Sequence, residues 1–451
     1  MSTNKPILVQ EAMLFDMKGG AVERLPDRQS CEQLNARGNG AYLAGELAKA
    51  EALFIAAHEA DPTHPDPWGN LGLIWHTIGA VEDAQKCYMK ALELNPAQAR
   101  TWCNLGILNE EMGFPDHAER MFLRALEIEP THARSVGNLA QLYLKRFDFV
   151  RGWSMIERRL AAGQIQTMDR TYADMPRWNG LPTKKLAIWP EQGVGDQVLY
   201  GSLLYDLLKI GQPFVCELDE RLIPAFERAF RSGLHSGIMS GVSFVPKGHK
   251  DGFAGCTAHI PIMSLAYFLR RSIESFEAQR KQFLYADRHG RCFHRERMGT
   301  DGKKVAISWR SFHHDINKRI KDRKSASLDD FAPLGKRSDL QLVTVQYGDV
   351  RAELDAWTGH HIHRPDVDLF NDIDDVLAVI DACDAVVTTS NVTAHFAGAL
   401  GKETYLISSP DAPLFYHRPH PATGKHLWYP SVIPVNGPSW RAAIATVSEM
   451  L

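Results

Sequence analysis

The chain has 451 residues, too many for one ordinary hydrophobic core, so we expect two or three domains. Hydrophobic residues make up 44% of it and charged residues 23%, proportions typical of soluble globular proteins. The formal net charge of −3 gives no reason to expect nucleic acid or an acidic membrane surface as a partner.

The sequence gives no sign of targeting, of membrane insertion or of covalent cross-links. The N-terminal segment MSTNKPILVQEAMLFDMKGG has no basic region followed by an apolar run, so it predicts no signal peptide. No stretch reaches the ~18–20 apolar residues that span a bilayer. The 7 cysteines are scattered without a CxxC pair, which argues against a disulfide framework and against a structural zinc site. We expect a cytoplasmic protein without a transmembrane segment.

From Cys31 the sequence repeats with a period of 34 residues, in windows that begin at Cys31, Pro65, Ala99 and Ala133. The eighth position of each window is small and the twenty-fourth is large: Gly38, Gly72, Gly106 and Ala140 against Phe54, Tyr88, Phe122 and Ile156. The first three windows carry a proline at position 32, which stops a helix because it lacks an N–H: Pro62, Pro96 and Pro130. Small residues let paired helices approach each other, and such pairs must stack to bury their apolar faces. This pattern is typical of tetratricopeptide repeats.

We therefore predict an N-terminal tetratricopeptide α-solenoid over residues 31–164. Its helix pairs are expected at 31–64, 65–98, 99–132 and 133–164, after a poorly ordered lead-in over residues 1–30. The last pair is expected to be a cap, because Arg159 stands where a small residue is expected and no proline closes the unit.

Three windows also carry asparagine at the sixth position, namely Asn70, Asn104 and Asn138. The equal spacing predicts one row on the concave side of the array. An amide both donates and accepts hydrogen bonds, so this row is suited to hold an extended peptide backbone without reading its side chains. It resembles the asparagine ladder of the protein O-GlcNAc transferases. The alternative is that Asn-Leu-Gly is common at this point of the repeat and fixes the helix.

From about Lys184 the pattern changes to short apolar runs that alternate with helical stretches. The runs expected as strands lie at 186–189, 213–218, 242–246, 305–309, 340–346, 385–389 and 404–407. Strands separated by helices predict parallel sheets joined by right-handed crossovers. A polar stretch near residue 300 divides them into two Rossmann-like domains, 184–298 and 299–451, that would face a cleft.

The first notable strand-to-helix junction is EQGVGD, residues 191–196. Gly193 and Gly195 allow a tight turn and a close approach of the backbone to a substrate. Asp196 then stands at the mouth of the following helix, where it is either a catalytic carboxylate or only a helix cap.

The second junction is TTSNVTAHFAGALG, residues 388–401. Ser390 or Asn391 is a natural N-cap, and the free N–H groups and dipole of the helix start form a site for a phosphate or diphosphate. His395 in the first turn would add a charged or neutral donor, although a histidine on such a helix more often packs inside.

Taken together, these segments resemble tetratricopeptide-fused bacterial glycosyltransferases, which are related to the ADP-heptose heptosyltransferases and have the GT-B fold. The resemblance extends over about residues 31–440, and its motifs are 388–401, ISWRS (307–311) with Lys324-Ser325, VQYGD (345–349), DLFNDIDDVLAVIDACDAVV (368–387) and WYPSV (428–432). It implies that Asp196 is the catalytic base. It also implies a donor-phosphate site formed by Ser308, Arg310, Ser311, Lys324, Ser390, Asn391, Thr393 and His395. The heptosyltransferases carry Asp at the position of Ser390.

Other charged clusters have simpler readings. The histidines at 313–314, at 360, 361 and 363, and at 417 and 420 lack a carboxylate or cysteine partner at a recognised spacing, and GT-B enzymes need no bound metal, so we expect no metal and no cofactor. The basic run 318–324 is either a loop over the donor phosphates or a solvated surface loop.

The leading interpretation is a glycosyltransferase that moves a sugar from a nucleotide-sugar to an acceptor held by the repeat array. The acceptor is expected to be a protein, because flagellin glycosyltransferases among the relatives are also built as repeats plus transferase. Two alternatives remain: a non-catalytic scaffold with a degenerate transferase domain, and an enzyme of lipopolysaccharide assembly with a glycan acceptor.

Overall fold

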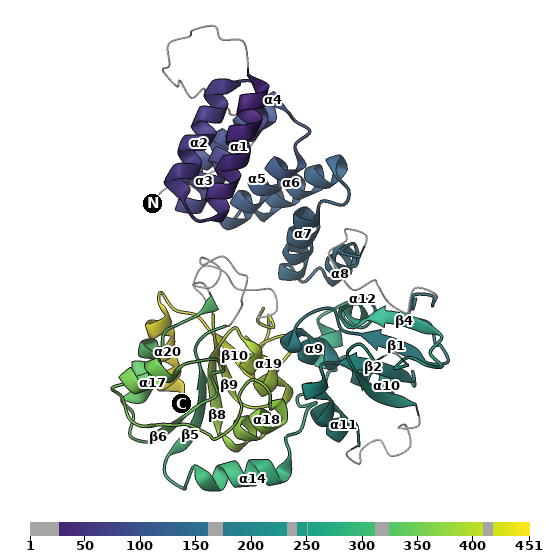
Figure 1. The fold of residues 1–451 in the computed structure, drawn as a ribbon. Coiled ribbons are helices and arrows are strands. Elements are labelled where there is room, and N and C mark those ends of the chain that lie inside the picture. The colour runs from purple at the N-terminus through teal and green to yellow at the C-terminus, as the bar shows by residue number, and fades with distance from the viewer. Residues whose placement is uncertain (1–26, 161–174, 232–240, 250, 312–323, 409–417) are drawn as a thin grey trace. The chain divides into compact units, whose positions relative to one another are not determined.

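The computed structural model describes residues 27–160, 175–231, 241–249, 251–311, 324–408 and 418–451. The chain divides into two compact units, Met1–Ile165 and Gln166–Leu451 (Figure 1). The first is helical throughout its described part, and the second contains all the described strands.

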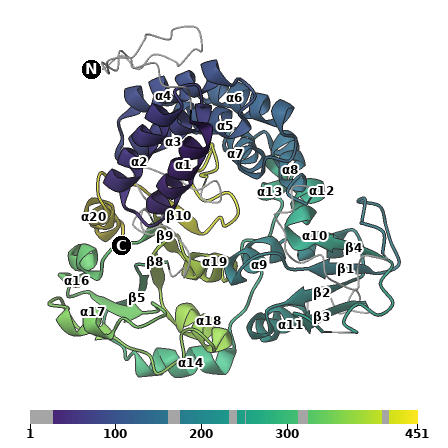
Figure 2. The ribbon, with the colours of Figure 1, turned by 45° about the horizontal axis from the view of Figure 1, so that its top comes forward.

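The first unit consists of helix pairs stacked in a curved row (Figure 2). Its described helices are α1 (Arg28–Leu43), α2 (Leu47–Ala60), α3 (Pro65–Ile78), α4 (Val81–Leu94), α5 (Ala99–Glu111), α6 (Pro115–Ile128), α7 (Ala133–Lys145) and α8 (Phe149–Glu157). The two helices of a pair pack on each other, and the second helix of each pair packs on the first helix of the next. The predicted solenoid of tetratricopeptide type is confirmed.

The small residue at repeat position 8 lets the paired helices approach each other, as predicted, and the large residue at position 24 fills the space beside it. A Cβ atom placed on Gly72 would lie 2.6 Å from the ring of Tyr88, and one placed on Gly106 would lie 2.6 Å from the ring of Phe122. Each glycine therefore marks the point where the aromatic ring of the partner helix lies against the backbone. The proline prediction holds as well, since α2, α4 and α6 each end two residues before the proline at position 32.

The first helix begins earlier than the predicted lead-in allows. Asp27 caps α1 by accepting a hydrogen bond of 3.0 Å from the N–H of Ser30, so the helix starts at Arg28. The remainder of the predicted lead-in lies outside the described residues. At the other end of the array, Trp153 of α8 and Arg159 just after it are both buried.

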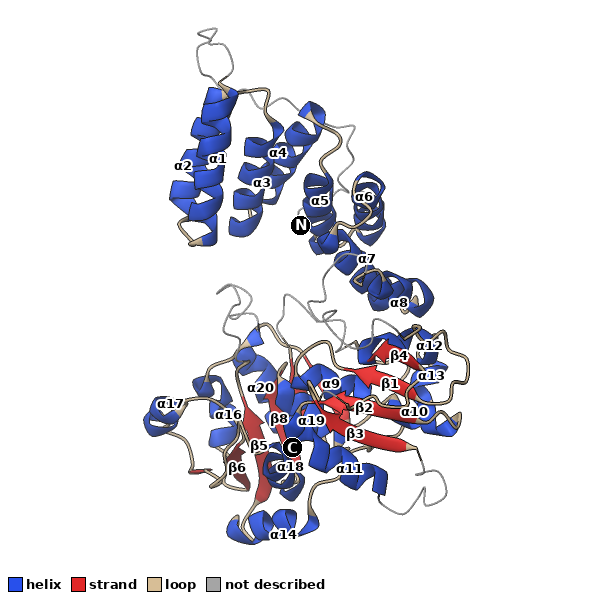
Figure 3. Cartoon of the chain, turned by 45° about the vertical axis from the view of Figure 1, so that its right-hand side comes forward, coloured by secondary structure: helices blue, strands red, loops and turns tan. Residues whose placement is uncertain are grey.

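The second unit holds two sheets in which every described strand pair is parallel, as predicted (Figure 3). The first sheet has the order β3-β2-β1-β4, with β1 (Leu186–Trp189), β2 (Phe214–Leu218), β3 (Val242–Pro246) and β4 (Ala258–Pro261). The second has the order β10-β9-β8-β5-β6-β7, with β5 (Lys303–Ser308), β6 (Leu340–Thr344), β7 (Ile362–His363), β8 (Ala385–Thr389), β9 (Thr404–Ile407) and β10 (Val432–Val435). Their central strands β1, β2, β5 and β8 are buried along nearly their whole length, as parallel strands covered by helices must be.

Three strands were not predicted from the sequence, namely β4, β7 and β10. Each is short, and β10 contains Pro434, which usually argues against a strand. The proline is tolerated because β10 lies at the edge of its sheet, where only its β9 side is paired.

The described helices of the second unit are α9 (Val194–Gly201), α10 (Leu204–Lys209), α11 (Ile223–Arg231), α12 (Leu265–Leu269), α13 (Glu274–Glu277), α14 (Arg288–Arg297), α16 (Ala332–Gly335), α17 (Arg351–Ala356), α18 (Ile373–Ala382), α19 (Val392–Ala399) and α20 (Trp440–Met450).

The boundary predicted at residue 299 falls too late in the chain. Helix α14 packs on α18, and the buried ring of His294 lies 2.7 Å from a carboxylate oxygen of Asp375. By its packing α14 thus belongs with the second sheet, and the polar stretch near residue 300 is only the turn between α14 and β5. The chain also returns to the first half, because Trp428 packs edge-on against Tyr200 and Phe276.

Candidate functional site

In each sheet the strand order reverses at one strand, and residues predicted to belong to the site lie at the carboxyl end of that strand. In the first sheet β1 lies between β2 and β4, and in the second β5 lies between β6 and β8. In open parallel sheets such reversal points, at the carboxyl ends of the strands, are where ligands bind. The segment before Asp196 follows β1, and Ser308 ends β5.

The two reversal points meet through helices α9 and α19, which lie side by side (Figure 2). A Cβ atom on Gly195 would lie 2.9 Å from Cδ2 of His395, so glycine at this position permits the close approach. Gly193 is the N-cap residue of α9, and the point that a Cβ of Gly193 would occupy lies in open space.

Asp196 lies in the first turn of α9, where it is partly buried. Burial raises the pKa of its carboxyl group to about 6, against the opposing effect of the positive charge of Lys324. Burial in turn lowers the pKa of the Lys324 ammonium group, which the charge of Asp196 partly restores. The structure thus brings the two predicted residues together, and because Gly193 is the N-cap, Asp196 is not the cap residue of α9.

Of the two candidate caps in the sequence, Ser390 and Asn391, it is Asn391 that caps α19. Its Oδ1 accepts a hydrogen bond of 2.9 Å from the N–H of Thr393, and its Nδ2 donates to the hydroxyl of Ser308 at 2.8 Å. The cap therefore ties the end of β8 to the end of β5. Ser390, just before it, is partly exposed.

Gln346 is a residue whose role the sequence reasoning missed, although its segment VQYGD was noticed. Its Oε1 accepts hydrogen bonds from the hydroxyl of Ser308 at 3.0 Å and from the N–H groups of Trp309 and Arg310 at 2.8 Å. The side chain is buried just beyond β6. It fixes the backbone that leaves β5, and a buried amide directly after a strand is the signal that would have revealed it.

Arg310 does not present a free guanidinium group. It forms an ion pair with Glu353 and donates to the carbonyl of Asp349 at 2.6 Å. Ser311 is buried, and its N–H donates to the hydroxyl of Ser325 at 3.2 Å. Of the two cations predicted for the donor phosphates, Arg310 is thus already neutralised by a carboxylate, whereas Lys324 lies near Asp196.

His395 is partly buried on α19, and its Nδ1 lies 3.1 Å from the hydroxyl of Tyr429. Burial lowers the pKa of the imidazole to about 4, so the ring is neutral at physiological pH. Burial also keeps the pKa of Tyr429 well above its ordinary value, and the charge of Asp196 acts in the same direction. Asp196, Lys324, His395 and Tyr429 thus form one cluster.

The asparagine row of the first unit differs from the expectation. Asn70 and Asn104 are only 2% and 4% exposed, and Asn70 donates its amide to Asn35 at 2.8 Å. Asn104 accepts from Arg134 at 3.4 Å, and Asn138 donates to the sulfur of Cys103 at 3.7 Å. The row is therefore not an open ladder of amides, because its groups bind neighbouring repeats.

This pairing is a general feature of the array. Side chains 35 residues apart bond between successive first helices of the pairs: Asn35 with Asn70, Tyr42 with Thr77 at 3.0 Å, His76 with Glu111 at 2.7 Å, and Glu110 with Lys145. These bonds support the alternative reading, in which the asparagines fix the helices.

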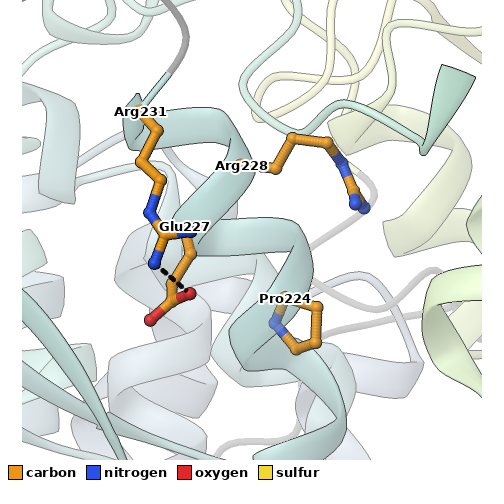
Figure 4. Close-up of a pocket in the computed structure, with 4 residues that line it drawn as sticks. All are labelled: Pro224, Glu227, Arg228 and Arg231. Carbon is orange, nitrogen blue, oxygen red and sulfur yellow. Dashed lines mark hydrogen bonds and ion pairs between the residues drawn. The ribbon is translucent and has the colours of Figure 1, made fainter.

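A separate pocket of about 490 Å³ lies on α11 and is lined by Pro224, Glu227, Arg228 and Arg231 (Figure 4). Arg231 forms an ion pair of 2.6 Å with Glu227, and Arg228 is bound to Asp374 of α18. The charges that line this pocket are thus already matched, and none of the predicted site residues lines it.

The described ranges show neither a metal-binding group nor a membrane-spanning helix. They contain no group of three or more His, Cys, Asp or Glu side chains placed to hold a metal ion. None of the described helices is both long and apolar enough to cross a membrane. The predicted basic run, except Lys324, and the histidines at 313, 314 and 417 lie outside the described residues.

A match to a family model supports the repeats of the first unit. A family model described as "Tetratricopeptide repeat" matches residues 65–98 and 99–132, which are the second and third predicted windows. Among solved structures, PilF of Pseudomonas aeruginosa is 23% identical over 31% of this chain and 63% of its own, with a TM-score of 0.29. MamA is 20% identical over 31% of this chain and 81% of its own, with a TM-score of 0.27.

Among curated proteins, Protein FlbA of Caulobacter vibrioides is 28% identical over 304 residues, which are 62% of this chain. They are 48% of FlbA, so the match spans about half the length of that relative. Residues 65–132 are therefore tetratricopeptide repeats, within a chain that is similar to FlbA over much of its length.

Proposed function

We propose that the second unit is a glycosyltransferase of GT-B type that takes its sugar from a nucleotide-sugar donor. The observation that carries the proposal is the partly buried carboxyl group of Asp196, held near Lys324 where the reversal points of two parallel sheets meet. A raised carboxyl pKa next to a cation, at the ligand-binding edge of a sheet, is typical of a group that exchanges protons during catalysis.

In this proposal Asp196 accepts the proton of the acceptor hydroxyl group. The hydroxyl oxygen forms a bond to the anomeric carbon of the sugar, and the bond from that carbon to the diphosphate oxygen breaks. The electron pair leaves with the nucleoside diphosphate. Its negative charge is stabilised by Lys324 and by the N-terminus of α19. Asn391, Ser308 and Gln346 hold the strand ends around this point rather than react.

The acceptor is proposed to be a protein that docks on the repeat array, with flagellin as the first to test. Stacked repeats create extended surfaces that suit a polypeptide partner. The buried asparagines would then support that surface instead of gripping the peptide themselves. A scaffold without activity and an enzyme with a glycan acceptor are the competing outcomes.

The test is a hydrolysis and binding screen of the purified full chain against nucleotide sugars, followed by the variant Asp196→Asn. The amide keeps the size of the side chain but cannot accept the proton, so kcat should fall by about 10²–10⁴-fold with little change in donor affinity. Asp287→Asn is the matched control, since Asp287 caps α14 outside the cluster, and its kcat should equal that of the wild type.

Each result separates the candidates. Donor turnover that disappears in Asp196→Asn supports the proposal, whereas an unchanged rate removes Asp196 from the reaction. A chain that neither binds nor hydrolyses any nucleotide sugar is a scaffold. Glycan analysis of flagellin and of lipopolysaccharide in a deletion strain then distinguishes a protein acceptor from a glycan acceptor.

A further inference from the structure

Tyr429 is the least expected member of the cluster. It follows Trp428 in the segment that returns to the first half of the unit, and it is only 2% exposed. No role was predicted for it from the sequence. Its hydroxyl group lies 3.1 Å from Nδ1 of His395.

The ring of Tyr429 is held in place from several sides. It lies against the backbone of α19 at Gly398, where a Cβ atom would be 2.7 Å from its Cδ1. Phe283 stacks on it at an interplanar angle of 14°, and the ring of His426 lies 5.3 Å from it. A ring fixed in this way places its hydroxyl at one point, with little freedom to turn toward another partner.

The protonation states of the two side chains decide which of them donates this hydrogen bond. The phenol of Tyr429 keeps its proton. Within the described parts of the chain, its hydroxyl group is hydrogen-bonded to His395. A buried hydroxyl that donates to nothing is costly, so the phenol donates to Nδ1. The neutral imidazole then carries its own single proton on Nε2.

The other edge of the imidazole faces α9. The atoms Cδ2 and Nε2 lie 2.9 and 3.4 Å from the point where a Cβ of Gly195 would stand, next to Asp196. A proton on Nε2 therefore lies where the two reversal points meet, and Gly195 leaves space for it because it has no side chain.

We propose that Tyr429 is a positioning residue that locks His395 in the tautomer with its proton on Nε2. In that state the ring is a neutral hydrogen-bond donor for an anionic oxygen. This second part rests on the proposed function, in which the oxygen belongs to the diphosphate of the nucleotide sugar. Because this donor is neutral, it binds the oxygen without adding a positive charge beside Asp196.

The tautomer can be measured directly by ¹⁵N NMR of the full chain labelled at histidine, with His395→Gln used to assign the signals. The wild type should show a protonated Nε2 and an unprotonated Nδ1 at His395. Tyr429→Phe, which keeps the ring and removes the hydroxyl, should lose this single tautomer. Tyr405→Phe is the matched control, because its ring is buried and its hydroxyl donates to a carboxylate oxygen of Glu403 at 3.1 Å, outside the cluster, and the His395 signals should not change.

A proton on Nδ1 in the wild type, or an unchanged tautomer in Tyr429→Phe, would overturn the inference. The wild-type spectrum alone decides the tautomer, so the test survives a variant that fails to fold. Uridine and guanosine diphosphates, titrated as probes, should bind Tyr429→Phe about 2–10-fold more weakly than the control, the worth of one hydrogen bond. If neither the wild type nor any variant binds a nucleotide while the tautomer is as expected, the proposed function fails and the role of Tyr429 at His395 stands.

Discussion

Both units bury polar side chains, but they use them in different ways. In the repeat array the amide of Asn70 bonds to Asn35 one repeat away, and the same spacing recurs along the first helices of the pairs. In the α/β unit the polar groups come from α9, from α19 and from Lys324, which lie far apart in the chain, and they converge on one place. Polar side chains that bond at a regular spacing therefore stabilise neighbouring repeats. Titratable groups that converge from different elements instead mark a candidate functional site.

The largest expected effect on the free energy of unfolding comes from ionising the partly buried carboxyl group of Asp196. Its pKa of about 6 in the folded chain lies above the ordinary 3.8, so between these values the folded state holds a proton that the unfolded state has released. Stability thus falls as the pH rises through that window. Asp196→Asn should leave the unfolding free energy of the α/β unit unchanged below about pH 4 and raise it by about 1–3 kcal/mol above about pH 6.

Chemical denaturation of the wild type and the variant at several pH values measures this difference. Asp287→Asn is the control with the opposite sign, because the N–H of Gly290 lowers the pKa of Asp287 and its contribution is present only above the ordinary value. A stability loss in Asp196→Asn at neutral pH would show that the carboxylate is structural, like the polar pairs of the array.

The next largest effect on stability comes from the packing of repeat position 8 against the aromatic ring at position 24. Gly106→Ala would drive a methyl group against the ring of Phe122, so we expect a loss of about 1–3 kcal/mol in the unfolding free energy of the array. Gly137 lies in α7, and apart from its chain neighbours and the backbone of its own helix nothing lies within 4 Å of the point that a Cβ would occupy. Gly137→Ala should therefore stabilise the array by about 0.5–1 kcal/mol. Thermal unfolding followed by circular dichroism compares the two, and equal effects would contradict the predicted helix contact.

The smallest effect is the coupling between Asn35 and Asn70. A double-mutant cycle with alanine should give an interaction energy of about 0.5–1.5 kcal/mol, as for one buried hydrogen bond. The variants should leave donor hydrolysis unchanged. An interaction energy near zero, combined with lost binding of a protein acceptor, would restore the reading of the row as a peptide holder.

Much of the fold was predictable because its determinants are local. The period of the small and aromatic positions predicted the helix pairs, and apolar runs such as 385–389 predicted strands with correct ends. Strand β10 was missed because a proline inside a strand is tolerated only at a sheet edge, which depends on the topology. Helix α14 was assigned to the wrong half because its packing on α18 leaves no mark in the local sequence.

The candidate site was predictable only in part. Asp196 and His395 were singled out by their place after buried strands, and the structure places His395 against Gly195, the neighbour of Asp196. The neutralisation of Arg310 by Glu353 and the bond between Tyr429 and His395 join segments far apart in the chain, so no local pattern reveals them. Burial of Asn70 and Asn104 was missed for the same reason, since equal spacing predicts a row but not what faces it.

If Asp196 acts as a base, kcat/KM must depend on the protonation of its carboxyl group in the free enzyme. For the wild type, kcat/KM for the donor should rise with pH through an acid limb at about pH 6, where the carboxyl group loses its proton. Because Lys324 lowers the pKa of Asp196, Lys324→Gln should move that limb to higher pH. A value of kcat/KM that stays flat across about pH 5–8 in the wild type, or a limb that does not move in Lys324→Gln, would show that Asp196 is not the base.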